Sequence, residues 1–208
     1  MKRIALLLCT LFFCTALFAQ SAEESEEIQY QHEYEDQVQF IYSQNQEGDQ
    51  YIRISLSPEF PLFLGNPFTD GKMKTGGMAN LGYHYFFTPT LAFGIDFSFA
   101  FHPTIGGNIF NSIPILATIT YQPTYKNFEF PLTLGLGFAW ETYGNQTYWP
   151  GFVLKPQAGV HYRLNQNWSL GGDLSYTFMP QFLKLYGKAD ENFMGQFLSV
   201  DIVARYYF

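Results

Sequence analysis

Cysteine is almost absent from this chain of 208 residues, and its two cysteines, Cys9 and Cys14, both lie near the N-terminus. They fall within the apolar run Ile4–Phe18, which follows a basic start and precedes small residues. This pattern is typical of a secretory signal peptide, which we expect to cover residues 1–19. The remaining chain would then contain no thiol, so disulfides and thiolate metal sites are excluded from it.

Charge is also scarce and unevenly distributed. Charged residues make up 14% of the chain, and residues 20–50 hold nine acidic residues but no Lys or Arg. Residues 51–208 carry equal numbers of acidic and basic residues. We expect the acidic, Gln/Glu-rich segment 20–50 to be flexible and periplasmic. Because no basic patch could neutralise a phosphate backbone, the sequence disfavours nucleic acid as a partner.

Long hydrophobic runs are missing after the N-terminal segment, which excludes a membrane protein built from helices. The apolar residues alternate instead. Between Phe128 and Trp140 every second residue is large and apolar, and the residues between them are polar or small. This alternation is too long for an ordinary strand of about 5–6 residues. It does match the roughly 9–11 residues of a tilted strand that crosses a bilayer.

Eight segments show this alternation. They cover residues 50–57, 76–87, 91–102, 113–121, 128–141, 152–163, 168–179 and 197–208. Eight is the smallest strand number of single-chain transmembrane barrels, which have short periplasmic turns and longer extracellular loops. The connections alternate in the same way, the longer ones being 58–75, 103–112, 142–151 and 180–196. We therefore predict an all-β fold, a closed eight-stranded antiparallel transmembrane up-and-down barrel over residues 51–208.

Alternation alone leaves open which face points outward, since a soluble barrel would bury its apolar face. A soluble barrel needs an exterior with about 25–35% charged residues. Here the polar face carries Gly, Ala, Ser, Thr and Asn with one or two charges per strand, and the apolar face carries no Lys or Arg. An outward Arg or Lys at the bilayer midplane costs roughly 2–4 kcal/mol. We therefore expect the apolar face to contact lipid.

The last strand ends the chain on alternating apolar residues, Val200, Ile202, Ala204, Tyr206 and Phe208. This ending resembles the signal that the barrel-assembly machinery of the outer membrane recognises. With the segment Asn167–Gly172, it makes the chain similar to small eight-stranded outer-membrane barrels such as OmpX, the OmpA transmembrane domain and OmpW, and to spirochaetal barrels. The resemblance implies a location in the cell outer membrane, with outer-membrane lipid and the assembly machinery as partners.

Charged residues on the inward face should form an ion-pair network, because a buried charge is costly unless it is paired. The network would comprise Arg53, Asp96, Glu129, Glu141, Lys155, Arg163, Asp173, Asp201 and Arg205, joined by His84 and His161. Barrel closure predicts a contact between Arg53 and Asp201, and hairpin geometry predicts one between Glu141 and Lys155. The interior of an eight-stranded barrel has little spare room, so a stabilising plug is favoured over a polar pore.

For function, we expect a structural or surface-interaction role, in which loops 58–75 and 180–196 contact host or other extracellular ligands. The alternative is an OmpW-like narrow channel for passive uptake of small hydrophobic molecules. Apolar loop residues could serve either role, or lie at the lipid headgroups; they are Phe60, Leu62, Phe63, Leu64 and Phe68.

Catalytic, cofactor and metal sites are not expected. A lipid A-modifying enzyme is a second alternative, but the His-x-Ser pattern of a deacylase is missing. A transferase arrangement of His102, Ser112 and Asp70 has uninformative spacing. His32 could bind a metal with neighbouring acidic residues, although a solvated acidic stretch is the commoner explanation.

Overall fold

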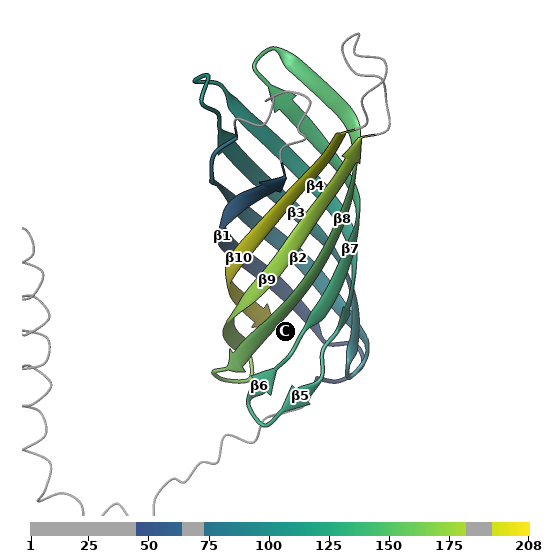
Figure 1. Ribbon diagram of the computed structural model, residues 1–208. Helices are drawn as coiled ribbons and strands as arrows, with labels where there is room; N and C mark the ends of the chain where they lie inside the picture. Colours follow the sequence, from purple (N-terminus) through teal and green to yellow (C-terminus); the bar gives the residue numbers. More distant parts are fainter. Residues whose placement is uncertain (1–44, 64–72, 182–192) are drawn as a thin grey trace, which may run out of the picture. The chain divides into compact units, whose positions relative to one another are not determined.

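The computed structural model describes residues 45–63, 73–181 and 193–208, which form one closed antiparallel barrel within the compact unit Tyr42–Phe208 (Figure 1). The expected signal peptide, most of the acidic segment, His32 and Asp70 lie outside these described residues. The strands are β1 (Gln50–Phe63), β2 (Gly76–Thr88), β3 (Leu91–Pro103), β4 (Ile109–Tyr121), β5 (Thr124–Tyr125), β6 (Phe128–Glu129), β7 (Leu132–Tyr143), β8 (Gln146–Arg163), β9 (Trp168–Gln181) and β10 (Phe193–Tyr207). No helix in this part of the chain is long and apolar enough to cross a membrane.

Each long strand pairs with its neighbours along the chain, and β1 closes the barrel against β10. The closing ladder runs from Tyr51 opposite Tyr207 to beyond Leu56 opposite Ile202. Gln50 and Phe208 extend it by exchanging two backbone hydrogen bonds, of 3.2 and 3.0 Å. The strands β5 and β6 have only two residues each, and the other eight strands form the wall. The predicted eight-stranded antiparallel barrel is therefore confirmed.

The barrel has two different ends, which we call the turn end and the loop end. The turn end holds the β2–β3 and β8–β9 connections and the small β5–β6 hairpin. The loop end holds the β3–β4 and β7–β8 hairpins, and the β7–β8 hairpin rises above its neighbours in Figure 1. The sequence pattern predicts that the loop end is extracellular.

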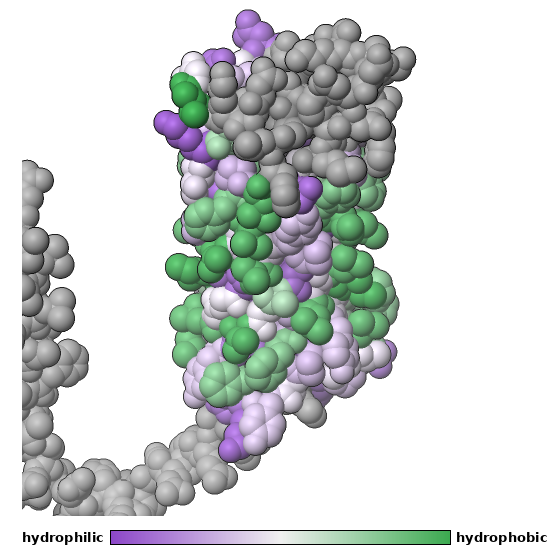
Figure 2. Space-filling view, viewed as in Figure 1, coloured by the Kyte–Doolittle hydropathy of each residue, from purple (hydrophilic) through white to green (hydrophobic). Residues whose placement is uncertain are grey.

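The alternation places polar side chains inside and apolar side chains outside. On β1, Arg53 is 2% exposed while the adjacent Ile54 is 53% exposed. The same two-residue period runs along β2, β3 and β4. Figure 2 shows apolar side chains spread over the wall of the barrel. Exposing such a large apolar surface to water is unfavourable in free energy, so the wall is suited to contact with hydrocarbon.

Several strands are longer than predicted, which shortens the connections. The expected loop 142–151 is a two-residue turn, Gly144–Asn145, because β7 and β8 remain paired up to Tyr143 opposite Gln146. The expected loop 58–75 begins with strand, since β1 continues through Pro58 to Phe63. Residues 64–72 of that loop and 182–192 of the expected loop 180–196 lie outside the described residues.

The predicted strand 128–141 is divided into β6 and β7 by Phe130 and Pro131. Proline has no N–H to donate to a ladder, which accounts for the break. The Pro131 carbonyl still accepts a hydrogen bond from the Gly159 N–H at 3.0 Å. The chain therefore stays beside β8 through the break.

Candidate functional site

The lumen of the barrel contains three groups of side chains, stacked from the turn end to the loop end. The first is an aromatic cluster of Tyr51, Phe86, Ala92 and Tyr207. The second is an ionic network in the middle. The third is an apolar cluster of Phe110, Leu116, Ala139, Val153, Met179 and Phe197.

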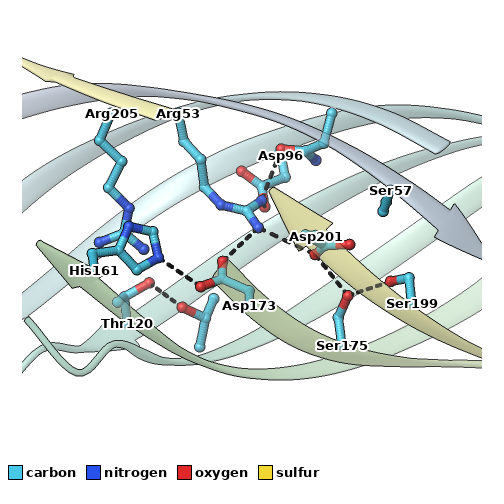
Figure 3. A network of polar contacts seen from close by, with 12 residues as sticks. Arg53, Ser57, Asp96, Thr120, His161, Asp173, Ser175, Ser199, Asp201 and Arg205 are labelled. Carbon is cyan, nitrogen blue, oxygen red and sulfur yellow. Dashed lines mark hydrogen bonds and ion pairs between the residues drawn. The ribbon is translucent and has the colours of Figure 1, made fainter. Parts of the chain in front are cut away.

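Arg53 is the hub of the ionic network (Figure 3). Its Nη2 lies 2.8 Å from Asp173 Oδ2, and its Nη1 donates to Asn80 Oδ1 at 2.9 Å. Asp96 and Asp201 each place a carboxylate oxygen 3.5 Å from the guanidinium. The contact predicted between Arg53 and Asp201 is present, but Asp173 is the nearer partner. Three carboxylates from three strands thus converge on one guanidinium.

Two histidines hold the carboxylates that face Arg53. His84 Nε2 lies 3.1 Å from Asp96 Oδ1, and His161 Nε2 lies 2.6 Å from Asp173 Oδ1. The His84 ring stacks on Tyr51, with ring centroids 4.5 Å apart and planes 4° from parallel. These contacts fix the orientation of each carboxylate toward Arg53.

Asp201 is held by small hydroxyl side chains instead. Ser175 Oγ donates to Asp201 Oδ2 at 2.9 Å, and it lies 2.6 Å from Ser199 Oγ. Serines at these positions leave room for the longer charged side chains opposite them. Ser175 and Ser199 are therefore part of the network, as Figure 3 shows.

A second ionic group lies near the turn end. Arg163 Nε is 3.4 Å from Glu129 Oε1, and Tyr207 OH donates to Glu129 Oε2 at 2.8 Å. The Arg163 guanidinium also stacks 3.4 Å above the Tyr207 ring. Arg205 donates to Gln122 Oε1 at 2.7 Å. This group joins β6, β8 and β10 to Gln122, the residue that follows β4.

The chain just before β1 completes this group. Asn45 is buried, and its Oδ1 accepts a hydrogen bond from Arg163 Nη2 at 2.6 Å. Gly48 N and Asp49 O exchange hydrogen bonds of 2.9 Å with the backbone of Phe86. The last residues of the acidic segment 20–50 are thus seated in the mouth of the barrel. No periodicity in the sequence marked Asn45 for this position.

Lys155 and Glu141 do not lie in the predicted arrangement. The register sets Lys155 opposite Gly135, whereas Glu141 is opposite Tyr148, so the predicted contact is wrong. With the expected loop 142–151, Glu141 would lie opposite Phe152, close to Lys155 along β8. The tight β7–β8 turn moves Glu141 opposite Tyr148, farther from Lys155. Lys155 Nζ instead lies 3.5 Å from Met78 Sδ, and both residues are buried.

Glu59 and His102 form a further pair near the loop end. His102 Nε2 lies 3.0 Å from Glu59 Oε2, and its Nδ1 lies 3.3 Å from the Lys74 carbonyl. The His102 ring stacks on Phe197 at 4.8 Å. Glu59 was not among the predicted residues because the expected first strand ended at residue 57, whereas β1 continues to Phe63. The alternation with Arg53, Ser55 and Ser57 could have found it.

The middle level of the lumen is occupied by side chains. The side chains at its middle level are almost entirely buried, and they come from strands around the barrel: Arg53, Asn80, Asp96, Leu116, Lys155, Asp173 and Asp201. Within the described ranges, no group of three His, Cys, Asp or Glu side chains could hold a metal ion. Ser112, considered for catalysis, is buried and lies opposite Ala100 on β3.

Comparison with known proteins gives the family. A protein-family model matches residues 29–206. An uncharacterized protein of Treponema pallidum (strain Nichols) is 30% identical over 185 residues, which cover 83% of both chains. The chain belongs to this family. A second uncharacterized relative from the same organism is 30% identical over 187 residues, covering 77% of this chain but 64% of the relative.

Solved structures of other proteins have a similar fold. Neisserial surface protein A (NspA) superposes with a TM-score of 0.58 at 15% identity, covering 78% of this chain and all of that one. OprG, an outer membrane protein from Pseudomonas aeruginosa, gives 0.53 at 14% identity, covering 79% and 97%. These likenesses concern the fold alone. The family member described here has the fold of small eight-stranded outer-membrane β-barrel proteins.

Proposed function

We propose that this protein is a non-conducting outer-membrane scaffold that presents its loop end to molecules outside the cell. The observation that supports this role is the filled lumen. Arg53 and the three carboxylates around it occupy the middle of the barrel and are almost completely buried. An eight-stranded barrel whose side chains fill its interior leaves no path for ions or solutes.

The described part of the loop end has a surface suited to contact. Asn108 donates to Tyr143 OH at 3.4 Å, which ties the β3–β4 hairpin to the β7–β8 hairpin. Residues 103–109 and 142–150 carry no charge. Ile105 at the β3–β4 tip is 68% exposed. A neutral, partly apolar rim favours a protein or glycan partner over recognition of a charged ligand.

Two measurements on refolded protein test the scaffold role. In planar bilayers we expect no discrete conductance steps, and in liposome swelling we expect no solute entry. Fluorescent proteoliposomes should bind host cells or matrix proteins, and Ile105→Ser should reduce that binding more than Leu164→Ser, a matched change at the turn end. Steady channel currents in the wild-type protein would contradict the scaffold role.

We also propose, as the second candidate, passive uptake of small hydrophobic molecules, because an apolar cluster lies in the outer half of the lumen. The β8–β9 ladder beside this cluster is interrupted at Lys155 and Pro156 and ends at Leu154 opposite Phe178. Because Pro156 has no N–H to donate, this seam is the weak side of the wall. Accumulation of a hydrophobic dye in proteoliposomes, reduced by Pro156→Ala, would favour uptake over the scaffold role.

We propose no catalytic role for the histidine at the loop end. His102 is buried, faces Glu59 and stacks on Phe197. These contacts are typical of a residue that holds β1 and β3 together. Loss of lipid A deacylation or acyl transfer in cells lacking the protein would contradict this assignment.

A further inference from the structure

The outer wall of the barrel has an apolar groove at the loop half of β1 and β2. Its floor is made of short side chains that face outward, Pro58, Gly77 and Ala79. Pro58 lies opposite Gly77, and Leu56 lies opposite Ala79, so the small residues occupy neighbouring positions on two strands. The groove is therefore built into the sheet and does not depend on one side-chain rotamer.

Large side chains form the two sides of this groove. On one side Ile202 lies opposite Leu56, and these side chains are 76% and 65% exposed. On the other side Phe99 lies opposite Ala79 and Phe101 lies opposite Gly77. Together they enclose about 380 Å³. These large side chains project from the wall, and the short residues between them leave the groove.

The surroundings of the groove show what kind of molecule can fill it. Ile54 and Leu81 continue the outward face toward the turn end, and Phe60 and Leu198 lie toward the loop end; all four are apolar. The groove thus lies inside the hydrocarbon-facing band. A polar group placed there would lose its hydrogen bonds to water, so the occupant must be a hydrocarbon chain.

A positive charge marks the loop end of the groove. Lys74 is exposed and precedes Gly77 by three residues, a distance of roughly 10 Å along an extended chain. Its backbone is fixed, because Lys74 N donates to Pro103 O at 2.8 Å and its carbonyl faces His102. Long Lys side chains at a membrane boundary place their ammonium group at headgroup level.

We propose that this groove binds one glycerophospholipid, with an acyl chain between Ile202 and Phe99 and the lipid phosphate at Lys74. The apolar floor and walls match the chain, and the ammonium group at the open end matches the phosphate. The proposal rests on the outer-membrane fold and not on the scaffold role. A second copy of the barrel is a poorer occupant of the groove. It would need a ridge on its surface to fill the groove, and it would leave the charge of Lys74 unmatched.

Native mass spectrometry of the full-length protein, purified in mild detergent, tests the site. We expect one phospholipid to remain bound at an activation energy that removes the detergent. Ala79→Leu, which fills the floor, should lower the lipid-bound fraction at least fivefold. Ala117→Leu is the matched control, because Ala117 is an outward alanine on β4 that does not line the groove. Heat-modifiable mobility on gels verifies that both variants are folded.

A titration of delipidated protein with phosphatidylglycerol tests the headgroup contact. Lys74→Gln should weaken binding several-fold, whereas Lys126→Gln, at the turn end, should not. Equal lipid retention in wild type and Ala79→Leu would overturn the proposal, as would equal losses in Ala79→Leu and Ala117→Leu. A retained lipid A molecule, or a dimer dissociated by Ala79→Leu, would assign the groove to another occupant and also overturn it.

Discussion

Arg53 is the residue on which three buried carboxylates converge. Its guanidinium lies within 3.5 Å of oxygens from Asp96, Asp173 and Asp201. In such a cluster, removing one partner costs far more than the pair itself contributes, because the remaining charges stay buried. The network therefore makes the interior sensitive to single changes.

Arg53→Gln keeps the hydrogen-bonding character but leaves three carboxylates without their cation. We expect a loss of about 3–5 kcal/mol in the free energy of unfolding, the usual cost of breaking a buried ion pair. Urea unfolding of refolded barrel in detergent measures it. Lys126→Gln, an exposed change at the turn end, should leave the unfolding midpoint unchanged; an equal midpoint for Arg53→Gln would show that the network contributes no stability.

Asn45 is the second residue with a large expected effect, although it precedes the first strand. Asn45→Ala removes the acceptor that Arg163 Nη2 contacts at 2.6 Å. The loss of a partner from a buried charged donor costs about 1–3 kcal/mol. We expect reduced heat resistance on gels and faster protease cleavage next to residue 45. Gln46→Ala, an exposed neighbour, serves as the control; identical behaviour of the two variants would mean that the Asn45 contact is dispensable.

At the scale of elements, close approach between strands depends on glycine. A Cβ added at Gly137 on β7 would lie 2.0 Å from the Ile115 carbonyl oxygen and 2.9 Å from Leu116 Cα on β4. Backbone atoms cannot move aside as a flexible side chain can. The β4–β7 ladder therefore requires glycine at this position.

Gly137→Ala should consequently separate β4 from β7. We expect slower folding into lipid vesicles and a destabilisation of at least about 2 kcal/mol, the scale of overpacking in a tightly packed site. Folding kinetics followed by gel mobility measure the effect. Gly106→Ala, at a β3–β4 tip position where an added Cβ meets nothing within 4 Å, is the control. Normal folding of Gly137→Ala would refute the close-packing argument.

At the scale of the whole molecule, the orientation in the membrane follows from the connections. Barrels of this class have short turns in the periplasm and longer loops outside. Asn145 lies at the tip of the β7–β8 hairpin, and Gln166 lies in the β8–β9 turn at the opposite end. Both residues are exposed. The chain after the expected signal peptide contains no cysteine, so single cysteines can be introduced without background.

We expect Asn145→Cys to react with a membrane-impermeant maleimide on intact cells. Gln166→Cys should react only after the outer membrane is permeabilised. The measurement is the labelled fraction of each variant by gel shift, with the cysteine-free chain as the background control. Labelling of Gln166→Cys on intact cells, with Asn145→Cys protected, would reverse the orientation.

The membrane barrel could be predicted from local alternation because each strand faces lipid on one side and the polar lumen on the other. Ile54 and Leu56 had to face lipid, so Arg53 and Ser55 had to face the lumen, and the structure agrees. The strand ends were less predictable. The expected first strand stopped at Ser57, yet β1 continues through Pro58, because proline is tolerated where its missing N–H is not needed. The expected strand 128–141 ran through Pro131, which instead separates β6 from β7.

The sequence by itself determined the wall of this protein: eight strands, their neighbours and the side that each residue faces. That information is local, since it depends on a period of two and on short connections. Only the tertiary structure decided which lumen residues meet. Asp173 contacts Arg53, Lys155 lies away from Glu141, and Asn45 lies in the mouth of the barrel. Those outcomes depend on the stagger between strands, the exact turn lengths and side-chain reach, which no alternation pattern encodes.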